Sequence, residues 1–298
     1  MWFNKASIYK LNGDFEISDE LLEQKRFTPC TKLQETSNGW TPPTGNYDAP
    51  LIYAASGYQL ICLTVETKVL PASAVKERIQ ESATELEQQL GRPLGKKDKE
   101  AIKIKVREQM LPQAFSKKKA IYAYIQASSN LLVINSTSDT DTTLFIKSLH
   151  EIIKEFSAIM INAETSPKNL MRTWLVEQFA PENFEIGNNC KLVDNDESKG
   201  AITCKNQDLS SKEIIAHLEG KMFPSELELT WNERIRFTLS DFLMLSKIKF
   251  LEVVTDEVKD TQTDSQDDLF DANFCLMAGE LTSLVFAVEG IFADEEEA

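Results

Sequence analysis

The chain has 298 residues, of which 42% are hydrophobic and 9% aromatic, a composition that can fill a sizeable core and excludes a chain disordered as a whole. It has no run of 18 apolar residues and no apolar leader after residues 1–5, which argues against a membrane span or a signal peptide and favours a cytoplasmic protein. The formal net charge is −15, which argues against a nucleic-acid partner unless the basic residues are clustered.

The N-terminal part of the chain predicts strands, a short helix and a loop. Residues 2–11 and 58–69 are rich in apolar and β-branched side chains, which is typical of buried strands. Ser18 precedes two acidic residues and predicts the N-cap of a short helix. The glycines and prolines of residues 39–45 predict a fixed loop.

Two helices are expected next. The first begins at Ser73 and ends at Gly91, and apolar residues recur along it at helical spacing. The second is expected from about Asp98 to Met110, although apolar residues also alternate there, so that a strand remains an alternative. Pro112 ends this segment. The pair is predicted to form a helical hairpin with a basic outer face.

The remaining chain mixes strands and helices without regular alternation. The predicted elements are a hairpin of residues 119–125 and 131–135, helices from Asp139 and Pro167, paired strands at 190–194 and 201–205, a meander at 222–231, 234–239 and 242–250, an acidic linker at 256–268, and a helix at 272–292. We therefore expect a mixed α/β (α+β) fold with irregular antiparallel sheets. The last helix is expected to dock in a core or a dimer interface.

This pattern suggests two α/β domains and an inserted arm. Residues 1–72 and 112–165 are expected to form the first domain. Residues 73–111 form the basic helical arm, and residues 166–298 form the second domain.

Positive charge is concentrated in one window. Residues 92–119 hold ten basic and three acidic residues, a net charge of +7, whereas residues 251–298 hold fourteen acidic and one basic, a net charge of −13. Three interpretations remain open: a solvated helix face with a solubilising tail, a phosphate-binding surface, or a basic arm that pairs with the acidic segment of a second protomer.

The most suggestive segment places one aromatic residue before three lysines. Phe115 precedes Lys117, Lys118 and Lys119. Clustered lysines can neutralise phosphates and release counterions, and an aromatic ring can contact a base or enter a groove. The alternative is that Phe115 packs in the core and the lysines are solvated. Because no sequence-reading motif accompanies the segment, any DNA binding should be sequence-independent.

No catalytic, metal or cofactor motif is present. The five cysteines are scattered without a CxxC spacing, so we expect reduced thiols rather than disulfides or a zinc site. The segment from Gly91 to Gly95 departs from a P-loop, because three residues separate the glycines and Lys97 stands where Ser or Thr should hold magnesium. We expect no enzyme activity.

Short motifs spread along the chain resemble those of the RdgC family. They lie at residues 27–30, 39–45, 70–71, 111–116, 207–209, 231–237 and 270–281. Each motif is weak alone, but together and in this order they are specific.

The resemblance implies a non-enzymatic protein that binds double-stranded DNA, with single-stranded DNA as a further candidate ligand. It implies a ring-shaped homodimer around the DNA, without a cofactor, which negatively regulates the RecA recombinase at the cytoplasmic nucleoid. Phe115 and Lys205 match positions at ring contacts or in the lumen, and Asn206 stands where a further basic residue would fit.

Arg92, Lys96, Lys97 and Lys99 supply the basic cluster of the arm, and Lys117, Lys118 and Lys119 add to it. The ring would be closed or opened around DNA by the helical arm. The alternative function is a protein-interaction module whose basic arm binds an acidic protein partner.

Overall fold

The computed structural model describes residues 1–13, 16–153, 155–194, 200–259 and 265–293. Contacts divide the chain into two compact units. The larger contains Met1–Glu16, Ile52–Leu60 and Tyr122–Ala298, and the smaller contains Ile17–Leu51 and Ile61–Ile121. In this division residues 73–111 share a unit with residues 17–51, 61–72 and 112–121, and residues on both sides of position 165 share the other unit.

The smaller unit is built on antiparallel strands. β2 (Thr36–Thr41) pairs with β4 (Tyr58–Val69), and β5 (Phe115–Gln126) follows β4 in the sheet order. α1 (Asp19–Glu23) begins at Ser18, whose Oγ accepts a hydrogen bond from the Leu21 N–H. The short helix is therefore confirmed.

The loop predicted at residues 39–45 is wrong over its first three residues. Gly39, Trp40 and Thr41 extend β2 and pair with Thr64, Leu63 and Cys62. Trp40 is fully buried. Its burial and the ladder hydrogen bonds outweigh the local turn preference of the glycine and prolines.

Gly39 is required by a close approach of two backbones. A Cβ at this position would lie 2.5 Å from the Phe27 Cα and 2.7 Å from the Lys25 carbonyl oxygen. We expect Gly39→Ala to destabilise the protein by about 2 kcal/mol, because backbone atoms cannot move aside without strain. Urea unfolding measures this, with Gly279→Ala as the control, since nothing lies within 4 Å of a Cβ there. Equal stability of the two variants would contradict the prediction.

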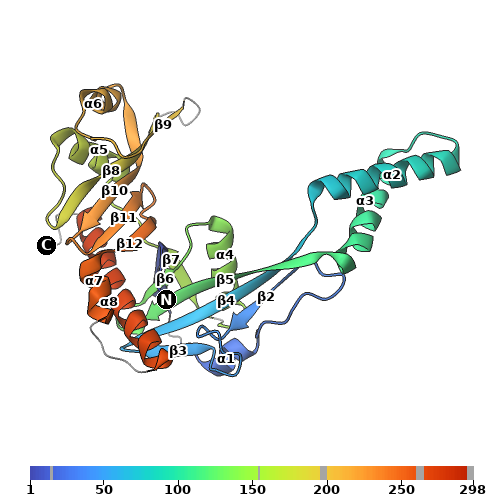
Figure 1. Cartoon of the computed structure of the whole chain (residues 1–298), viewed down its shortest axis with the longest axis horizontal. Helices are drawn as coiled ribbons and strands as arrows, with labels where there is room; N and C mark the ends of the chain where they lie inside the picture. The colour runs from blue at the N-terminus through green and yellow to red at the C-terminus, as the bar shows by residue number, and fades with distance from the viewer. Residues whose placement is uncertain (14–15, 154, 195–199, 260–264, 294–298) are drawn as a thin grey trace. The chain divides into compact units, whose positions relative to one another are not determined.

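The predicted helical hairpin is confirmed. α2 (Ala72–Leu90) and α3 (Lys96–Met110) lie side by side at the ends of β4 and β5 (Figure 1). α2 ends at Gly91, whose φ of 63° favours glycine. The two helices pack through a small apolar cluster that contains Leu94, Ile102 and Val106. The strand alternative for this segment is wrong, since burying these side chains against α2 requires helical spacing.

The larger unit contains most of the strands. They are β1 (Lys5–Asn12), β3 (Ile52–Ala55), β6 (Leu131–Ile134), β7 (Ser157–Met160), β8 (Phe184–Asp194), β9 (Ala201–Cys204), β10 (Met222–Trp231), β11 (Ile235–Ser240) and β12 (Leu245–Phe250). The order along the sheet is β2-β4-β5-β6-β1-β12-β11-β10-β8-β9, with β3 on β4 and β7 on β1. β1 pairs antiparallel with β12 through residues 5–6, with β6 through residues 7–10 and with β7 through residues 9–12. The mixed α/β class with antiparallel sheets is confirmed.

Five α-helices of this unit follow or flank the strands. They are α4 (Asp139–His150), α5 (Pro167–Glu177), α6 (Lys212–Glu219), α7 (Glu252–Lys259) and α8 (Gln266–Phe292). The acidic linker expected at 256–268 is largely wrong, because α7 includes residues 256–259 and α8 begins at Gln266, while residues 260–264 lie outside the described residues. The Ser265 Oγ caps α8 by accepting from the Asp268 N–H, so this helix begins six residues before the predicted start.

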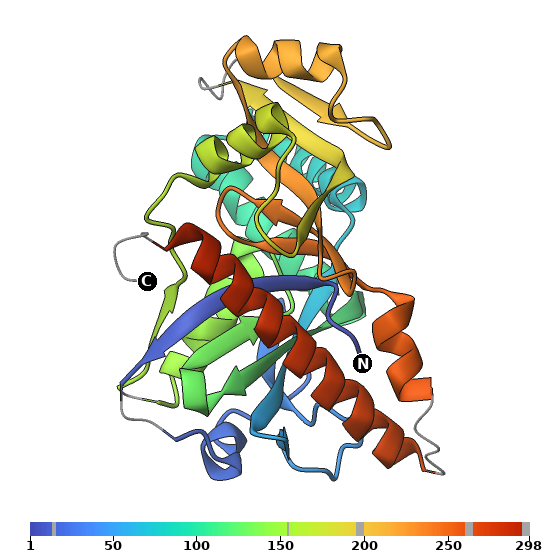
Figure 2. The same ribbon diagram turned by 90° about the vertical axis from the view of Figure 1, so that its left-hand side faces the viewer.

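α8 crosses the strands of the larger unit diagonally (Figure 2). Its Asn273 accepts from the Trp2 indole at 2.8 Å, Thr282 lies 2.9 Å from the Tyr124 hydroxyl, and Glu289 pairs with Lys10 at 2.9 Å. By length and composition α8 could cross a membrane, but its Phe274, Met277, Leu281, Leu284 and Val288 are buried in the main apolar cluster. That is the packing of a core helix.

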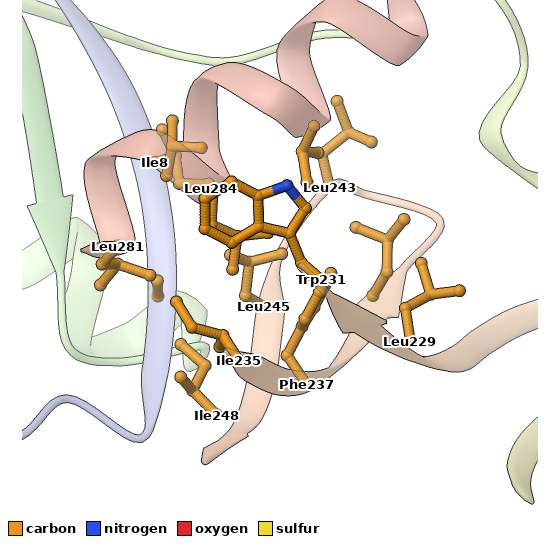
Figure 3. Packing of buried hydrophobic residues seen from close by; sticks show 14 of the residues in the cluster. Ile8, Leu229, Trp231, Ile235, Phe237, Leu243, Leu245, Ile248, Leu281 and Leu284 are labelled. Atoms are coloured by element: carbon orange, nitrogen blue, oxygen red, sulfur yellow. The ribbon is translucent and has the colours of Figure 1, made fainter. Parts of the chain in front are cut away.

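The core of the larger unit is continuous from the sheet to α8. Trp231 lies among Ile8, Leu245, Leu284 and their neighbours, which come from strands and helix alike (Figure 3). Arg234 fixes the same region from its edge, since its guanidinium donates to both carboxylate oxygens of Glu280 and to Glu257. These ion pairs hold α7 and α8 against the start of β11.

Candidate nucleic-acid interface

The positive charge of the hairpin lies on α3 rather than on both helices. Lys96, Lys99, Lys103 and Arg107 recur at spacings that place them along one side of α3. α2 carries four acidic and two basic residues. The expected basic outer face is therefore confined to α3.

Several of these basic groups have acidic partners. Arg92 pairs with Asp98 at 3.2 Å, Lys103 with Glu100 at 3.2 Å, and Arg107 with Glu35 at 3.1 Å. Such exposed pairs are weak and leave a site available to a stronger anionic ligand.

The first turn of α3 places three lysines beside Asp98, whose carboxylate accepts a hydrogen bond from the Gly95 N–H at 3.1 Å. Lys96, Lys97 and Lys99 are all exposed there. The positive end of the helix dipole adds to their charge, which suits a phosphate. Arg92 lies in the turn just before α3, so the structure brings together all four arm residues expected from the sequence.

The three lysines of β5 do not share one face. Side chains alternate along a strand, so Phe115, Lys117 and Lys119 lie on one face and Ser116 and Lys118 on the other. Phe115 is 87% exposed, which excludes the alternative that it packs in the core of its own chain. The Lys118 Nζ lies 5.2 Å from the centre of the Phe27 ring, a cation–π distance.

Lys118 also lies near a buried carboxylate. Glu66 on β4 is only 5% exposed and accepts a hydrogen bond from the Cys30 N–H at 2.6 Å. This hydrogen bond, together with one from Ser116 and the charges of Lys118 and Lys68, lowers the pKa of Glu66. Lys118 therefore has a structural role on its face of β5.

We expect Glu66→Gln to lower the melting temperature at neutral pH, because the ionised carboxylate stabilises the native state. The lowered pKa means that this stabilisation is present above pH 4.5 and is lost as the pH falls through the native pKa. The melting temperatures of the variant and the parent should therefore converge in acid. Glu81→Gln is the control, since Glu81 pairs with Arg78 at an exposed position. A difference that persists at low pH would show that charge is not the cause.

Lys205 belongs to the larger unit and lies just after β9. Together with Lys191 and Lys247 it lines a cavity of about 480 Å³. Lys191 pairs at 3.7 Å with Glu226, its register neighbour on β10. Sequence reasoning missed Lys191 and Lys247. The only signal was the alternation of the predicted strands, which does not show which strands lie together.

Asn206 follows Lys205 in a left-handed backbone conformation. Its φ is 50°, a left-handed conformation in which asparagine is several-fold enriched. Its N–H donates to the Asn189 side chain at 3.1 Å.

Within the described part of the chain, no group of three or more His, Cys, Asp or Glu side chains is arranged to hold a metal ion. The features present are an antiparallel α/β scaffold, a basic helix in a hairpin, and exposed lysines on β5. They define a mixed α/β protein with exposed basic residues on α3 and β5.

Comparison with known proteins gives the family. A family model described as “Putative exonuclease, RdgC” matches residues 1–295. The chain belongs to the RdgC family of recombination-associated proteins, so the resemblance inferred from the motifs is confirmed.

Three relatives illustrate the match. The recombination-associated protein RdgC of Aeromonas hydrophila is 32% identical over 302 residues and covers all of both chains. That of Psychromonas ingrahamii is 32% identical over 99% of both chains, and that of Proteus mirabilis is 31% identical over all of both. The similarity therefore includes both compact units.

Proposed function

We propose that this protein binds double-stranded DNA without sequence preference and surrounds it as a ring-shaped homodimer. By occupying DNA it limits RecA-dependent recombination at the nucleoid in the cytoplasm. The observation that carries the proposal is the set of exposed lysines in the smaller unit: Lys96, Lys97 and Lys99 on α3, and Lys117 and Lys119 on β5. The names of the relatives place the family in recombination.

The charge distribution fits this function. The whole chain carries −15, yet residues 92–119 carry +7. Lysine contacts with phosphates release counterions and carry no sequence information. The acidic remainder repels DNA elsewhere, so that binding is confined to the basic surfaces. Enclosure by a ring would lengthen the residence time without base contacts.

We also propose that the protein is not a nuclease, although the family description names an exonuclease. Metal-dependent phosphodiester cleavage uses carboxylates that hold one or two metal ions, and the described residues contain no such cluster. Incubation of labelled linear DNA with magnesium or manganese tests this. A nuclease activity that shortens the DNA progressively and co-purifies with the protein would contradict this proposal.

Fluorescence anisotropy with two unrelated duplexes at several salt concentrations tests DNA binding. We expect equal affinities and a log–log slope of roughly −4 to −8, which corresponds to about four to nine neutralised phosphates. Single-stranded DNA of the same length is the second ligand. Absence of binding at low salt would favour the protein-interaction module, whose basic arm binds an acidic partner.

A comparison of protein retention on closed circular and on linear DNA distinguishes a ring that surrounds DNA from a protein that binds its surface. A ring that surrounds DNA should remain on closed circles at high salt and leave linear DNA by sliding off its ends. Equal retention would argue against the ring. A RecA strand-exchange assay then tests whether prior occupation of the DNA lowers the yield.

A further inference from the structure

Two of the five cysteines face each other across a strand pair. Cys190 on β8 and Cys204 on β9 are direct register partners. In the same register the Asp194 N–H donates to the Gly200 carbonyl, so these two residues form a hydrogen-bonded pair. Hydrogen-bonded and non-hydrogen-bonded pairs alternate along an antiparallel ladder. Cys190 and Cys204 lie four residues further along the ladder and therefore also form a hydrogen-bonded pair. Cα atoms in such a pair are about 5.5 Å apart, within the range of roughly 4.4 to 6.8 Å that a disulfide spans. The Cβ atoms, about 5 Å apart in such a pair, must approach to about 4.5 Å for the S–S bond to form.

The two thiols point to the same side of the sheet. Both side chains are buried, Cys190 at 4% and Cys204 at 8% exposure, and both belong to the main apolar cluster. Burial, with a hydrogen bond to the Cys204 thiol, raises the pKa of Cys190 to about 12. The other cysteines are elsewhere: Cys30 and Cys62 lie in the smaller unit and Cys275 lies on α8.

The thiols become accessible when the strand pair opens. Cys190 and Cys204 contribute to the lining of the cavity of about 480 Å³, but the side chains of Lys191, Thr203 and Lys205 alternate to the opposite face of the strands from the buried thiols. β9 is only four residues long and ends the sheet order. A short edge strand opens locally at lower free energy than a central strand, which would bring the thiols into contact with solvent.

We propose that Cys190 and Cys204 form a redox-active dithiol, which a peroxide oxidises to an intramolecular disulfide that joins β8 to β9. One thiol, as the thiolate, attacks the peroxide, the O–O bond breaks, and a sulfenic acid and one water form. The second thiol attacks the sulfenic sulfur, the S–S bond forms, and a second water leaves. Two thiols lose two electrons in total, and hydrogen peroxide is reduced to two waters.

The disulfide would act on the edge of the sheet. It would tether β9, and with it the adjacent Lys205, to β8. A thiol such as glutathione or dithiothreitol would reverse the reaction by exchange. The scarcity of thiolate at the raised pKa of Cys190 predicts slow oxidation at neutral pH. The assignment concerns the thiol pair alone and does not depend on DNA binding.

The test uses the full chain with stoichiometric hydrogen peroxide. Free thiols, counted after denaturation, should fall from five to three per chain. A non-reducing peptide map of the unsubstituted protein should show one link between Cys190 and Cys204 within one chain. Dithiothreitol should restore five thiols.

Variants identify the pair. After peroxide treatment, the Cys275→Ser variant should still lose two thiols to the disulfide. The Cys190→Ala and Cys204→Ala variants should form no intramolecular disulfide, and circular dichroism checks that they fold. If a variant fails to fold, the peptide map of the unsubstituted protein decides. Five remaining thiols, sulfonic acids without a link, or a link to another cysteine or another chain would overturn the proposal.

Discussion

Replacing both Lys117 and Lys119 by alanine should lower the affinity for duplex DNA at least about tenfold at low salt, and equally for unrelated sequences. The two exposed lysines lie on one face of β5 and are expected to neutralise about one phosphate each. Each lost contact makes the log–log salt slope shallower by about 0.9, so the double variant should lose close to 2. Anisotropy titrations over a salt series measure both quantities.

Single and control variants sharpen this test. Lys118→Ala should have a smaller effect on DNA, because its ammonium lies over Phe27 and near Glu66. The charge-matched control is Lys32→Ala with Lys212→Ala, two exposed lysines outside the proposed surfaces. An equal loss in the control, or a change in sequence preference, would show that Lys117 and Lys119 are not phosphate contacts.

Phe115→Ala should shift the solution mass from dimer to monomer at micromolar concentration. The ring of Phe115 is 87% exposed, and contact between an apolar ring and water is unfavourable in free energy unless a partner covers the ring. Buried aromatic side chains dominate the binding energy of many interfaces. A loss of about 2 kcal/mol would raise the dimer dissociation constant roughly 30-fold. Light scattering after size exclusion measures the mass, and the effect should exceed that of any single lysine change.

A contact with DNA is the other role open to Phe115. In that case Phe115→Ala would keep the mass of the parent and lose affinity for DNA. Phe242→Ala is the matched control, because Phe242 is a 65% exposed phenylalanine of the larger unit. A parental mass and parental DNA affinity for Phe115→Ala would exclude both roles.

Elements with strong local signals could be predicted from the sequence. The apolar spacing of α2 and the position of Gly91 gave the hairpin, because both depend on residues close in sequence. The extension of β2 over Gly39 and Trp40 could not be predicted. It depends on pairing with β4 more than twenty residues later, and local composition indicates a turn.

The clustering of basic residues could be predicted from the sequence, but which of their side chains share one face of the protein could not. The sequence shows three consecutive lysines, whereas strand alternation and the distant Phe27 and Glu66 assign Lys118 a different environment. Lys191 and Lys247 approach Lys205 only because β8 and β12 are parts of one folded sheet. Cys190 and Cys204 looked scattered for the same reason, since the register of β8 and β9 is a long-range property.

The contacts of α8 determine when the larger unit can fold during translation. Trp2 and Lys10 bind partners on α8 that follow them by 271 and 279 residues. At about 5 to 20 residues per second, a ribosome needs roughly 15 to 55 s to reach those partners. Residues 17–121 emerge well before, so the smaller unit can be complete while β1 still lacks the helix that covers it. The nascent larger unit therefore keeps apolar strand surface uncovered through most of synthesis.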